Sequence, residues 1–404
     1  MKRVAVLFFS EAHYWKSCQG LISDLAACYD RAFSGAVDFF GISHDPSTWE
    51  ATAQKIAAGN YSVISFIDFR FYLPFWTETL KKYLKSQVTW GWHTDGSFGN
   101  RMPEWISLSK VLKSESVVVF ASSTAHQGFV EGILDGENLV RRFPFPFVAS
   151  RQIGEESDGR KWRQKWGIRD DQKVYLYTGR VSYQKNVHHL VNLFSEWKSK
   201  DAVLVIYGKS DNGGCRQNPQ GVYLHYASEI FFESLNQAEA SGVRVIYPGF
   251  AEEAELNHAY LGSDVFVSLS TSIGEDFGRS VAEALSLGLS CVLTAWGGYK
   301  DFGDIPGVRT IPIQLKDEGL DIDTRNFFQQ MEVAPEKKEK VAEAFLRKWS
   351  LDAQAELLRK LYDKPGFFEG ISSKGKNYFK ALFTSESERE YFDLLEPYLH
   401  SYWK

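Results

Sequence analysis

The sequence predicts an α/β protein with two doubly wound domains, each a parallel sheet covered by helices. Three observations lead to this prediction. Strand-like and helix-like runs alternate along nearly the whole chain, which is typical of parallel sheets. The alternation is interrupted once, around residue 148, and then restarts. The length of 404 residues is enough for two or three domains with cores of their own.

The first domain is expected to contain five strands joined mostly by helices. We place them at residues 4–9, 37–41, 61–67, 88–92 and 116–121, with the first strand buried. The segment RRFPFPFVASRQIGEESDGR follows, in which Pro144 and Pro146 disfavour helix and the polar tail indicates a connection. The domain boundary is therefore predicted near Val148.

The second domain is expected to repeat this architecture, although no internal sequence repeat is present. Its strands are predicted at residues 174–178, 203–207, 243–247, 265–270 and 291–295, with a long insertion at 209–242. Pro335 is predicted to open a helix, as proline does at a first helical position, and a second helix, LDAQAELLRKLY, follows. The last helix, about residues 378–404, is expected to return to the first domain. The second domain then covers 149–377.

Composition excludes some classes of protein. The formal net charge of −5 disfavours a nucleic-acid binder, which usually shows a basic face. The four cysteines lack the spacing of metal ligands and are expected to be reduced thiols in a cytoplasmic protein. The apolar run near the N-terminus is too short for a membrane span. We expect no metal and no cofactor.

The stretch GEDFGRSVAEALSLG carries two glutamates, Glu275 and Glu283, behind the strand predicted at 265–270. A helix-like run at 279–287 fills the stretch, and Gly288 stands where the helix should stop. We place Glu275 in the loop and Glu283 on the helix, where a carboxylate among apolar residues needs hydrogen-bond donors. Sugar hydroxyls are such donors, and the free N–H groups of a helix start suit phosphate. The alternative is that both acids only complement the helix dipole.

A second cluster, TGRVSYQKNVHHLV, lies at another predicted strand-to-helix turn. Arg180 and Lys185 are five residues apart across this turn, and a planar guanidinium with a compact ammonium suits a diphosphate. Ligands of open parallel sheets bind outside the carboxyl ends of the strands. The alternative is two solvated surface charges. Two such turns in one sheet favour a shared pocket for a phosphorylated sugar.

These segments together resemble the retaining GT-B glycosyltransferases of family 4, the glycosyl transferases group 1, over roughly residues 174–298. The residues that carry the resemblance are Gly179, Arg180, Lys185, Asn186, Gly208, Gly249, Glu275, Phe277, Gly278, Glu283, Ala284, Gly288, Gly297 and Gly298. As a set these motifs are specific, whereas each alone is weak. The resemblance implies two Rossmann-like domains facing across a cleft.

The resemblance also implies roles. Arg180 and Lys185 would neutralise the diphosphate of a nucleotide-sugar donor, with a UDP-sugar favoured. Glu275 would hold a hydroxyl of the donor sugar, and Glu283 the ribose hydroxyls. The implied catalytic residues are Arg180, Lys185, Glu275 and His93, and the implied donor-binding residues are Glu283, Phe277, Gly278, Arg279, Gly179, Gly208 and Gly20. A hexosyl group would pass, with retention, to a hydroxyl of a glycan or glycolipid, and the latter would bring peripheral membrane contact.

The first half departs from the family pattern. The loop after the first strand, SEAHYWKSCQG, has Gly20 in place of a glycine-rich run, and no G-x-G-x-x-G fingerprint of a dehydrogenase follows the strand. His93 is expected at a strand end facing the cleft, with Asp95 behind it. His13, Tyr14 and Trp15 are candidates for stacking on an acceptor sugar, although buried packing is the commoner role of aromatics.

Three other functions stay open at this point. The first is a GT-B carbohydrate- or nucleotide-binding protein without catalytic activity. The second is a GT-B sugar-nucleotide epimerase, which would change the donor sugar without transferring it. The third is a glucan phosphorylase, which would need a pyridoxal lysine for which no motif is present.

Overall fold

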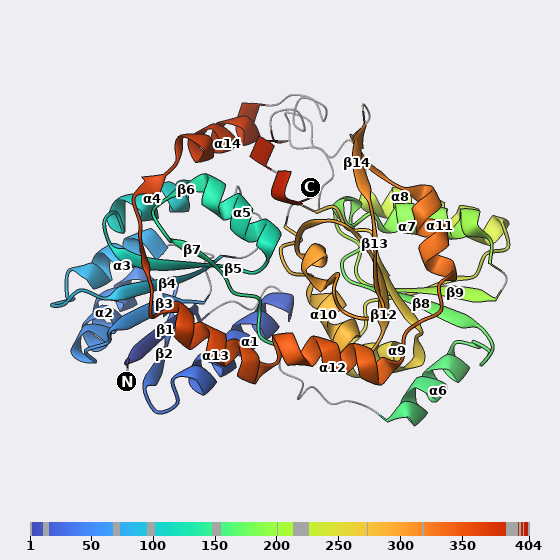
Figure 1. The fold of residues 1–404 in the computed structure, drawn as a ribbon, viewed down its shortest axis with the longest axis horizontal. Coiled ribbons are helices and arrows are strands. Elements are labelled where there is room, and N and C mark those ends of the chain that lie inside the picture. Colours follow the sequence, from blue (N-terminus) through green and yellow to red (C-terminus); the bar gives the residue numbers. More distant parts are fainter. Residues whose placement is uncertain are drawn as a thin grey trace. The chain divides into compact units, whose positions relative to one another are not determined.

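The protein was analysed as a computed structural model. It describes residues 2–10, 16–67, 73–94, 102–147, 155–199, 201–212, 226–272, 274–316, 319–384, 395, 397–398 and 400–402. The chain forms two compact units: the first contains Met1–Val148 and Lys348–Lys404, and the second contains Ala149–Arg347. Both are parallel sheets with helices packed on them (Figure 1).

The first unit is built on a seven-stranded sheet. Its parallel strands are β1 (Val4–Phe9), β2 (Val37–Ile42), β3 (Val63–Phe66), β4 (Thr89–Thr94), β5 (Ser116–Ala121) and β7 (Val140–Arg142), in the order β2-β1-β3-β4-β5-β7. Its helices before the boundary are α1 (Lys16–Ala32), α2 (Trp49–Ala58), α3 (Leu73–Lys81), α4 (Met102–Val111) and α5 (Thr124–Ile133). Strands β1, β3, β4 and β5 are buried and mostly apolar because helices cover both faces of a parallel sheet, whereas the edge strand β2 is largely exposed.

The last part of the chain completes this sheet. The chain returns at Lys348, within α12 (Lys338–Trp349), and continues as α13 (Leu351–Leu361), β16 (Gly366–Phe367), β17 (Gly370–Ile371) and α14 (Ser373–Thr384). Strand β16 pairs antiparallel with β5, and β17 pairs with β6 (Leu134–Asp135). Helix α13 packs on α1. The assignment of residues 348–377 to the second domain was therefore wrong, because these contacts bind them to the first.

A buried hydroxyl group fixes the returning segment. The Tyr362 hydroxyl, at the end of α13, lies 2.7 Å from the Tyr29 hydroxyl of α1. It occupies space that exists only because residue 91 is glycine: a Cβ on Gly91 would lie 1.8 Å from the Tyr362 oxygen and 2.5 Å from Ser65 Oγ. We call this the Gly91 socket. It joins β3, β4, α1 and the C-terminal segment at one point.

The second unit is built on six parallel strands in the order β10-β9-β8-β11-β12-β13. They are β8 (Lys173–Thr178), β9 (Ala202–Tyr207), β10 (Val245–Gly249), β11 (Val265–Ser268), β12 (Ser290–Thr294) and β13 (Val308–Ile311). The helices are α6 (Glu156–Lys165), α7 (Val187–Trp197), α8 (Ala227–Ala240), α9 (Glu253–Gly262), α10 (Arg279–Ser286) and α11 (Thr324–Glu332), and a hairpin of β14 (Ile313–Lys316) and β15 (Gly319–Ile322) follows β13. The five predicted strands are present, shifted by up to two residues.

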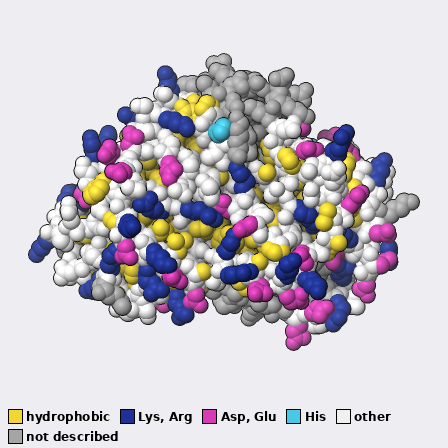
Figure 2. Space-filling view, in the orientation of Figure 1, with side chains coloured by type: hydrophobic (Ala, Val, Ile, Leu, Met, Phe, Trp, Pro, Cys, Tyr) yellow, Lys and Arg dark blue, Asp and Glu magenta, His cyan; other side chains and the backbone are white. Residues whose placement is uncertain are grey.

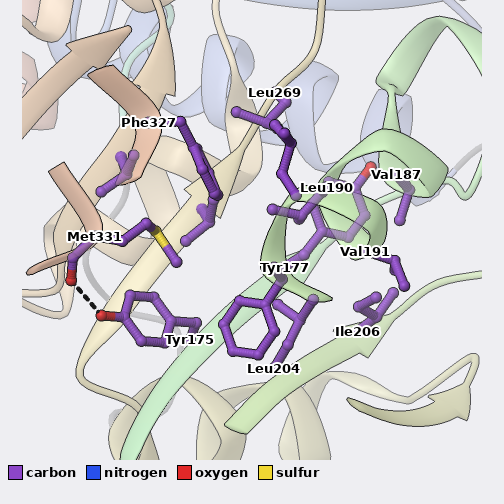
Figure 3. Packing of buried hydrophobic residues seen from close by; sticks show 14 of the residues in the cluster. Tyr175, Tyr177, Val187, Leu190, Val191, Leu204, Ile206, Leu269, Phe327 and Met331 are labelled. Atoms are coloured by element: carbon purple, nitrogen blue, oxygen red, sulfur yellow. Dashed lines mark hydrogen bonds between the residues drawn. The ribbon is translucent and has the colours of Figure 1, made fainter. Parts of the chain in front are cut away.

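One face of this sheet packs against α7, α8 and α11. Figure 3 shows Tyr177 of β8 beside Leu190 of α7, and Tyr175 of β8 beside Met331 of α11. The Tyr175 hydroxyl donates to the Met331 carbonyl at 2.5 Å, which ties α11 to the sheet (Figure 3). Outside this core, acidic and basic side chains are interspersed over the face drawn in Figure 2, and no single-sign block stands out there.

Candidate functional site

The strand order of the second unit marks where a ligand should bind. Strands β8, β9 and β10 run to one side of the sheet, and β11, β12 and β13 run to the other. The order reverses between β8 and β11, and in such sheets ligands bind at the carboxyl ends of the strands at this switch point. The two clusters found in the sequence follow β8 and β11. The fold therefore brings them to the same end of adjacent strands.

The connection from β8 to α7 is held against the connection after β11. Asn186, just before α7, has the left-handed backbone φ of 53°. Its amide donates to the Leu269 carbonyl and to Thr271 Oγ1, both at 2.9 Å. The Thr271 N–H in turn donates to the Gln184 carbonyl at 3.3 Å. These bonds fix the position of Lys185, which lies between the two anchored residues.

Lys185 and Glu275 form an ion pair at the switch point. The Lys185 ammonium donates to Glu275 Oε2, and the two side chains are only 17% and 8% exposed. The Glu275 carbonyl accepts the Gly298 N–H at 2.8 Å, which holds the loop before α10 against the segment after β12. The pKa of the Tyr299 hydroxyl is raised well above its usual range, first by burial and then by the charge of Glu275. A cation and an anion predicted from separate motifs thus meet directly.

Arg180, the second predicted cation, has a partner that the sequence did not reveal. Its Nη1 donates to Asp211 Oδ2 at 3.1 Å. Asp211 lies after β9, in the polar stretch that was interpreted only as an insertion. The sequence did contain a signal for Asp211. This residue lies three positions after Gly208 at the end of a strand, and Arg180 lies one position after Gly179 at the end of the neighbouring strand. The strand pairing that makes them neighbours was not visible in the sequence.

Glu283 lies on α10, as predicted, and is only partly buried. Its carboxylate accepts from Arg279 Nε at 3.3 Å and from the Tyr260 hydroxyl at 3.2 Å. Tyr260, on α9, also lies 2.6 Å from Thr178 Oγ1 at the end of β8. The pKa of Tyr260 is raised, by burial first and then by the charge of Glu283. Tyr260 therefore links the end of β8 to Glu283, a role that the sequence did not indicate.

The first turn of α10 is suited to bind an anion. Its N-cap residue is Gly278, with φ 90°, so no side chain caps the first N–H groups of the helix. Phe277, just before it, is buried and packs on Phe302 with the ring centroids 5.5 Å apart. Uncapped N–H groups and the positive end of the helix dipole favour phosphate. Arg279 and Gly278 thus lie where the donor was expected.

His93 is part of the first unit's core. It lies inside β4 rather than after it, is 3% exposed, and stacks on Phe120 with the ring centroids 4.4 Å apart. Its Nε2 lies 2.8 Å from the Tyr29 hydroxyl, beside the Gly91 socket. Burial lowers the pKa of His93 from 6.5 to about 3, so the ring is neutral near pH 7. These contacts are those of a packing residue.

The remaining predicted positions of the first half divide into two groups. Gly20 lies within α1, at the fifth residue of the helix, rather than in a loop after β1. It is therefore beyond the four N–H groups that a helix start leaves free, and its expected place in a phosphate-binding loop was wrong. Asp95, His13, Tyr14 and Trp15 lie outside the described residues.

Two comparisons with known proteins concern the sequence. Residues 158–302 match the family model described as glycosyl transferases group 1. An uncharacterized glycosyltransferase of Methanocaldococcus jannaschii is 28% identical over 199 residues, which are 48% of this chain and 43% of that protein. The match thus spans less than half of the curated relative.

Solved structures give the fold. Anabaena HepE in complex with UDP is similar with a TM-score of 0.64 and 14% identity, over 89% of this chain and 99% of that one. Sucrose-phosphate synthase of Thermosynechococcus elongatus has a TM-score of 0.57 and 17% identity, over 90% and 98% of the two chains. The chain therefore has the GT-B fold.

Two features are absent from the residues that the structure describes. No helix among them is long and apolar enough to cross a membrane. No group of three or more His, Cys, Asp or Glu side chains among them is placed to hold a metal ion.

Proposed function

We propose that this chain, which carries a glycosyl transferases group 1 domain on the GT-B fold, is a retaining glycosyltransferase. It moves a hexosyl group from a nucleotide sugar, with a UDP-sugar favoured, to a hydroxyl of a glycan or glycolipid. The observation that carries the proposal is the direct pairing of Lys185 with Glu275 at the switch point of the second unit. Support for UDP comes from the similar HepE structures, which hold UDP or UDP-glucose.

The donor's diphosphate is assigned to three positive features. These are the Lys185 ammonium, the Arg180 guanidinium and the uncapped first turn of α10. As the glycosidic bond breaks, negative charge builds on the leaving nucleoside diphosphate, and cations fixed beforehand stabilise it without reorganising. We propose that these groups supply the electrostatic stabilisation that a metal ion supplies in other transferases. No metal or cofactor is part of the proposed mechanism.

The two carboxylates are assigned to hydroxyl groups. Glu275 holds a hydroxyl of the donor sugar, and Glu283 holds the ribose. An ionised carboxylate has about four lone-pair sites. Glu283 accepts from Arg279 and Tyr260, at 3.3 and 3.2 Å, and these two contacts orient the carboxylate that we assign to the ribose hydroxyls.

The proposed reaction exchanges one bond at the anomeric carbon for another. The acceptor hydroxyl oxygen bonds to this carbon on the face from which the diphosphate leaves. The electron pair of the broken bond goes to the diphosphate oxygen, and the acceptor's proton passes to the leaving phosphate. No protein nucleophile takes part, and the anomeric configuration is kept. His93 is left out of this mechanism, because its ring is buried, neutral near pH 7 and bonded to Tyr29.

The acceptor assignment is the broadest part of the proposal. A glycolipid acceptor would bring the enzyme to the inner face of a membrane by peripheral contact, and we propose a cytoplasmic location. Of the four cysteines in the sequence, Cys28 and Cys291 are buried free thiols. Such thiols persist in a reducing compartment.

Donor turnover tests the proposal. Purified protein is incubated with UDP-sugars, and released UDP and the free sugar's anomer are followed by NMR. We expect slow hydrolysis to UDP and sugar with retained configuration, absent in Lys185→Ala and preserved in Lys165→Ala. Lys165 pairs with Glu255 in the same unit and is 55% exposed, which makes it a matched control.

Two results would overturn the proposal. Nucleotide binding without release of the nucleoside diphosphate from UDP-, GDP- or ADP-sugars, with oligosaccharide acceptors added, would indicate a binding protein. Conversion of the sugar while it stays joined to the nucleotide would indicate an epimerase.

A further inference from the structure

The Arg180–Asp211 pair differs from the other ion pair of the site in how it is held. Lys185 and Glu275 are 17% and 8% exposed, whereas Arg180 and Asp211 are 38% and 32% exposed. Water therefore reaches the second pair, and exchanging its partners costs less desolvation than opening the buried pair. Asp211 belongs to none of the motifs that resemble the family.

The backbone forces this pair together. The Val181 N–H donates to the Lys209 carbonyl, and the Asp211 N–H donates to the Val181 carbonyl, both at 3.0 Å. Next to these bonds, a Cβ on Gly208 would lie 1.7 Å from the Gly179 oxygen, so only glycine permits the two loops to approach this closely. The loops after β8 and β9 are thus joined, and Asp211 is fixed beside Arg180 rather than meeting it by chance.

Arg180 is held from behind as well. Its carbonyl accepts the Tyr177 hydroxyl at 2.8 Å, which anchors the backbone at the start of the loop. With its backbone and its guanidinium both fixed, Arg180 keeps one orientation at the carboxyl end of β8. A diphosphate bound there would meet an arginine whose charge is already balanced by a carboxylate.

We propose that Asp211 is a positioning residue that occupies Arg180 while the site is empty and is displaced by the diphosphate of the donor. This rests on the proposed function, because it takes the diphosphate as the ligand of Arg180. Asp211 then has two opposed effects. It orients the guanidinium for a bidentate contact, and it weakens nucleotide binding, since its charge competes with and repels the incoming phosphates. Product UDP is released faster for the same reason.

The test compares nucleotide affinities of the wild type and Asp211→Asn by calorimetry, using UDP, UMP, uridine and inorganic pyrophosphate. Asparagine keeps the shape and the backbone bond to Val181 but removes the charge. We expect UDP and pyrophosphate to bind up to about fivefold more tightly to Asp211→Asn, the upper end of the range for an exposed ion pair. UMP should gain less, and uridine should not change.

Two further measurements separate this role from a structural one. In an Arg180→Gln background, Asp211→Asn should no longer tighten UDP binding, because the guanidinium that Asp211 occupies is absent. The loss of UDP affinity with added salt should be steeper in Asp211→Asn than in the wild type, since Arg180 is then unscreened by its partner. Asp171→Asn, in the exposed pair with Arg169, is the matched control and should alter none of these values.

The outcomes distinguish the two proposals. If the wild type binds UDP but Asp211→Asn binds it equally or less tightly, or if uridine gains as much as UDP, the role of Asp211 is overturned and the proposed function stands. If neither protein binds any of UDP, GDP, ADP or pyrophosphate, both are overturned.

Discussion

Both units are built on a parallel sheet, but the polar groups clustered at their strands differ: they are neutral in the first unit and charged in the second. In the first unit the strand order is β2-β1-β3-β4-β5, and in the second it is β10-β9-β8-β11-β12-β13. At the Gly91 socket, four neutral groups bond to one another: the Tyr29, Ser65 and Tyr362 hydroxyls and the His93 ring. After β8, β9 and β11 of the second unit, the bonds instead join full charges, Lys185 with Glu275 and Arg180 with Asp211.

This difference shows which polar cluster supports structure and which is open to a ligand. The neutral cluster is nearly inaccessible to water, with Tyr362 only 1% exposed, and each bond satisfies a group that burial would otherwise leave without a partner. Of the two charged pairs, Arg180–Asp211 is partly exposed, with side chains 38% and 32% exposed, whereas Lys185–Glu275 is mostly buried, with side chains 17% and 8% exposed. Sequence alone treated His93 and Lys185 alike, whereas burial separates them.

The largest effect is expected from Lys185→Ala, which tests whether the charged pair of the second unit serves function as well as structure. We expect donor turnover to fall by about 10²–10³-fold, the usual effect of removing one preorganised donor to a developing anion. The unfolding free energy should also fall by about 3 kcal/mol, because Glu275 is left as a buried carboxylate without its cation. Turnover and urea unfolding, measured on the same preparation, check both effects.

The double variant Lys185→Ala/Glu275→Gln separates the two effects. Removing the stranded charge should return most of the lost stability but none of the activity. If the double variant were as unstable as the single one, the pair would owe its stability to packing rather than to charge.

In the first unit, Gly91→Ala should be the most damaging small substitution. The added methyl would lie 1.8 Å from the Tyr362 oxygen, so the returning segment must shift. Overpacking of this kind costs about 1–3 kcal/mol. Thermal unfolding measures the loss, and hydrogen exchange should show α13 less protected. Tyr362→Phe in the same chain removes the nearest atom and should recover part of the stability; no recovery would mean that the socket does not hold the segment.

The pH dependence of the unfolding free energy tests the neutral cluster of the first unit. We expect this cluster to destabilise the folded protein in acid. Burial holds the pKa of His93 at about 3, against 6.5 in the unfolded chain. Between these values the unfolded state binds the proton and the folded state does not, so stability falls as pH decreases below 6.5. Each pKa unit corresponds to about 1.4 kcal/mol, which predicts a loss of about 2 kcal/mol from pH 6.5 to 5.

Two histidine variants check this assignment. Urea unfolding at pH 7 and pH 5 should show a weaker pH dependence in His93→Gln. His126, whose pKa burial lowers to about 4, should contribute separately and in the same direction. An unchanged slope in His93→Gln would show that the ring is hydrated or charged in the folded protein.

The smallest expected effect concerns Tyr260→Phe. Loss of its hydroxyl removes the bonds to Thr178 and Glu283, each at the scale of about 1 kcal/mol. We expect the KM for the donor to rise a few-fold with kcat nearly unchanged, because the ribose is bound equally in the ground and transition states. A change confined to kcat would instead place Tyr260 near the reacting atoms.

Much of the fold could be predicted because parallel strands leave a strong pattern. The ten predicted strands are present, and Glu275 and Glu283 lie in the loop and on the helix as expected. The return of the chain at Lys348 was missed because β16 and β17 are two residues long, too short for any periodicity. Their pairing with β5 and β6 depends on the tertiary structure and leaves no local pattern in the sequence.

Site residues could be predicted only where they belong to one continuous sequence motif. Lys185 and Glu275 were found because each belongs to a strand-to-helix turn of recognisable spacing. Asp211 and Tyr260 were missed because they act through partners on neighbouring elements, and one sequence does not show which loops meet. His93 was placed at a strand end, although β4 runs past it to Thr94 and buries it.

The first unit is discontinuous in the sequence: the whole second unit, Ala149–Arg347, lies between its two segments. A ribosome therefore synthesises every residue of the second unit before it makes Tyr362. Domains tend to fold as they emerge. The second unit can therefore fold before the first, because the first still lacks Tyr362, whose hydroxyl occupies the space beside Gly91. A released fragment that ends at Arg347 should thus contain a folded second unit tethered to an incomplete first one.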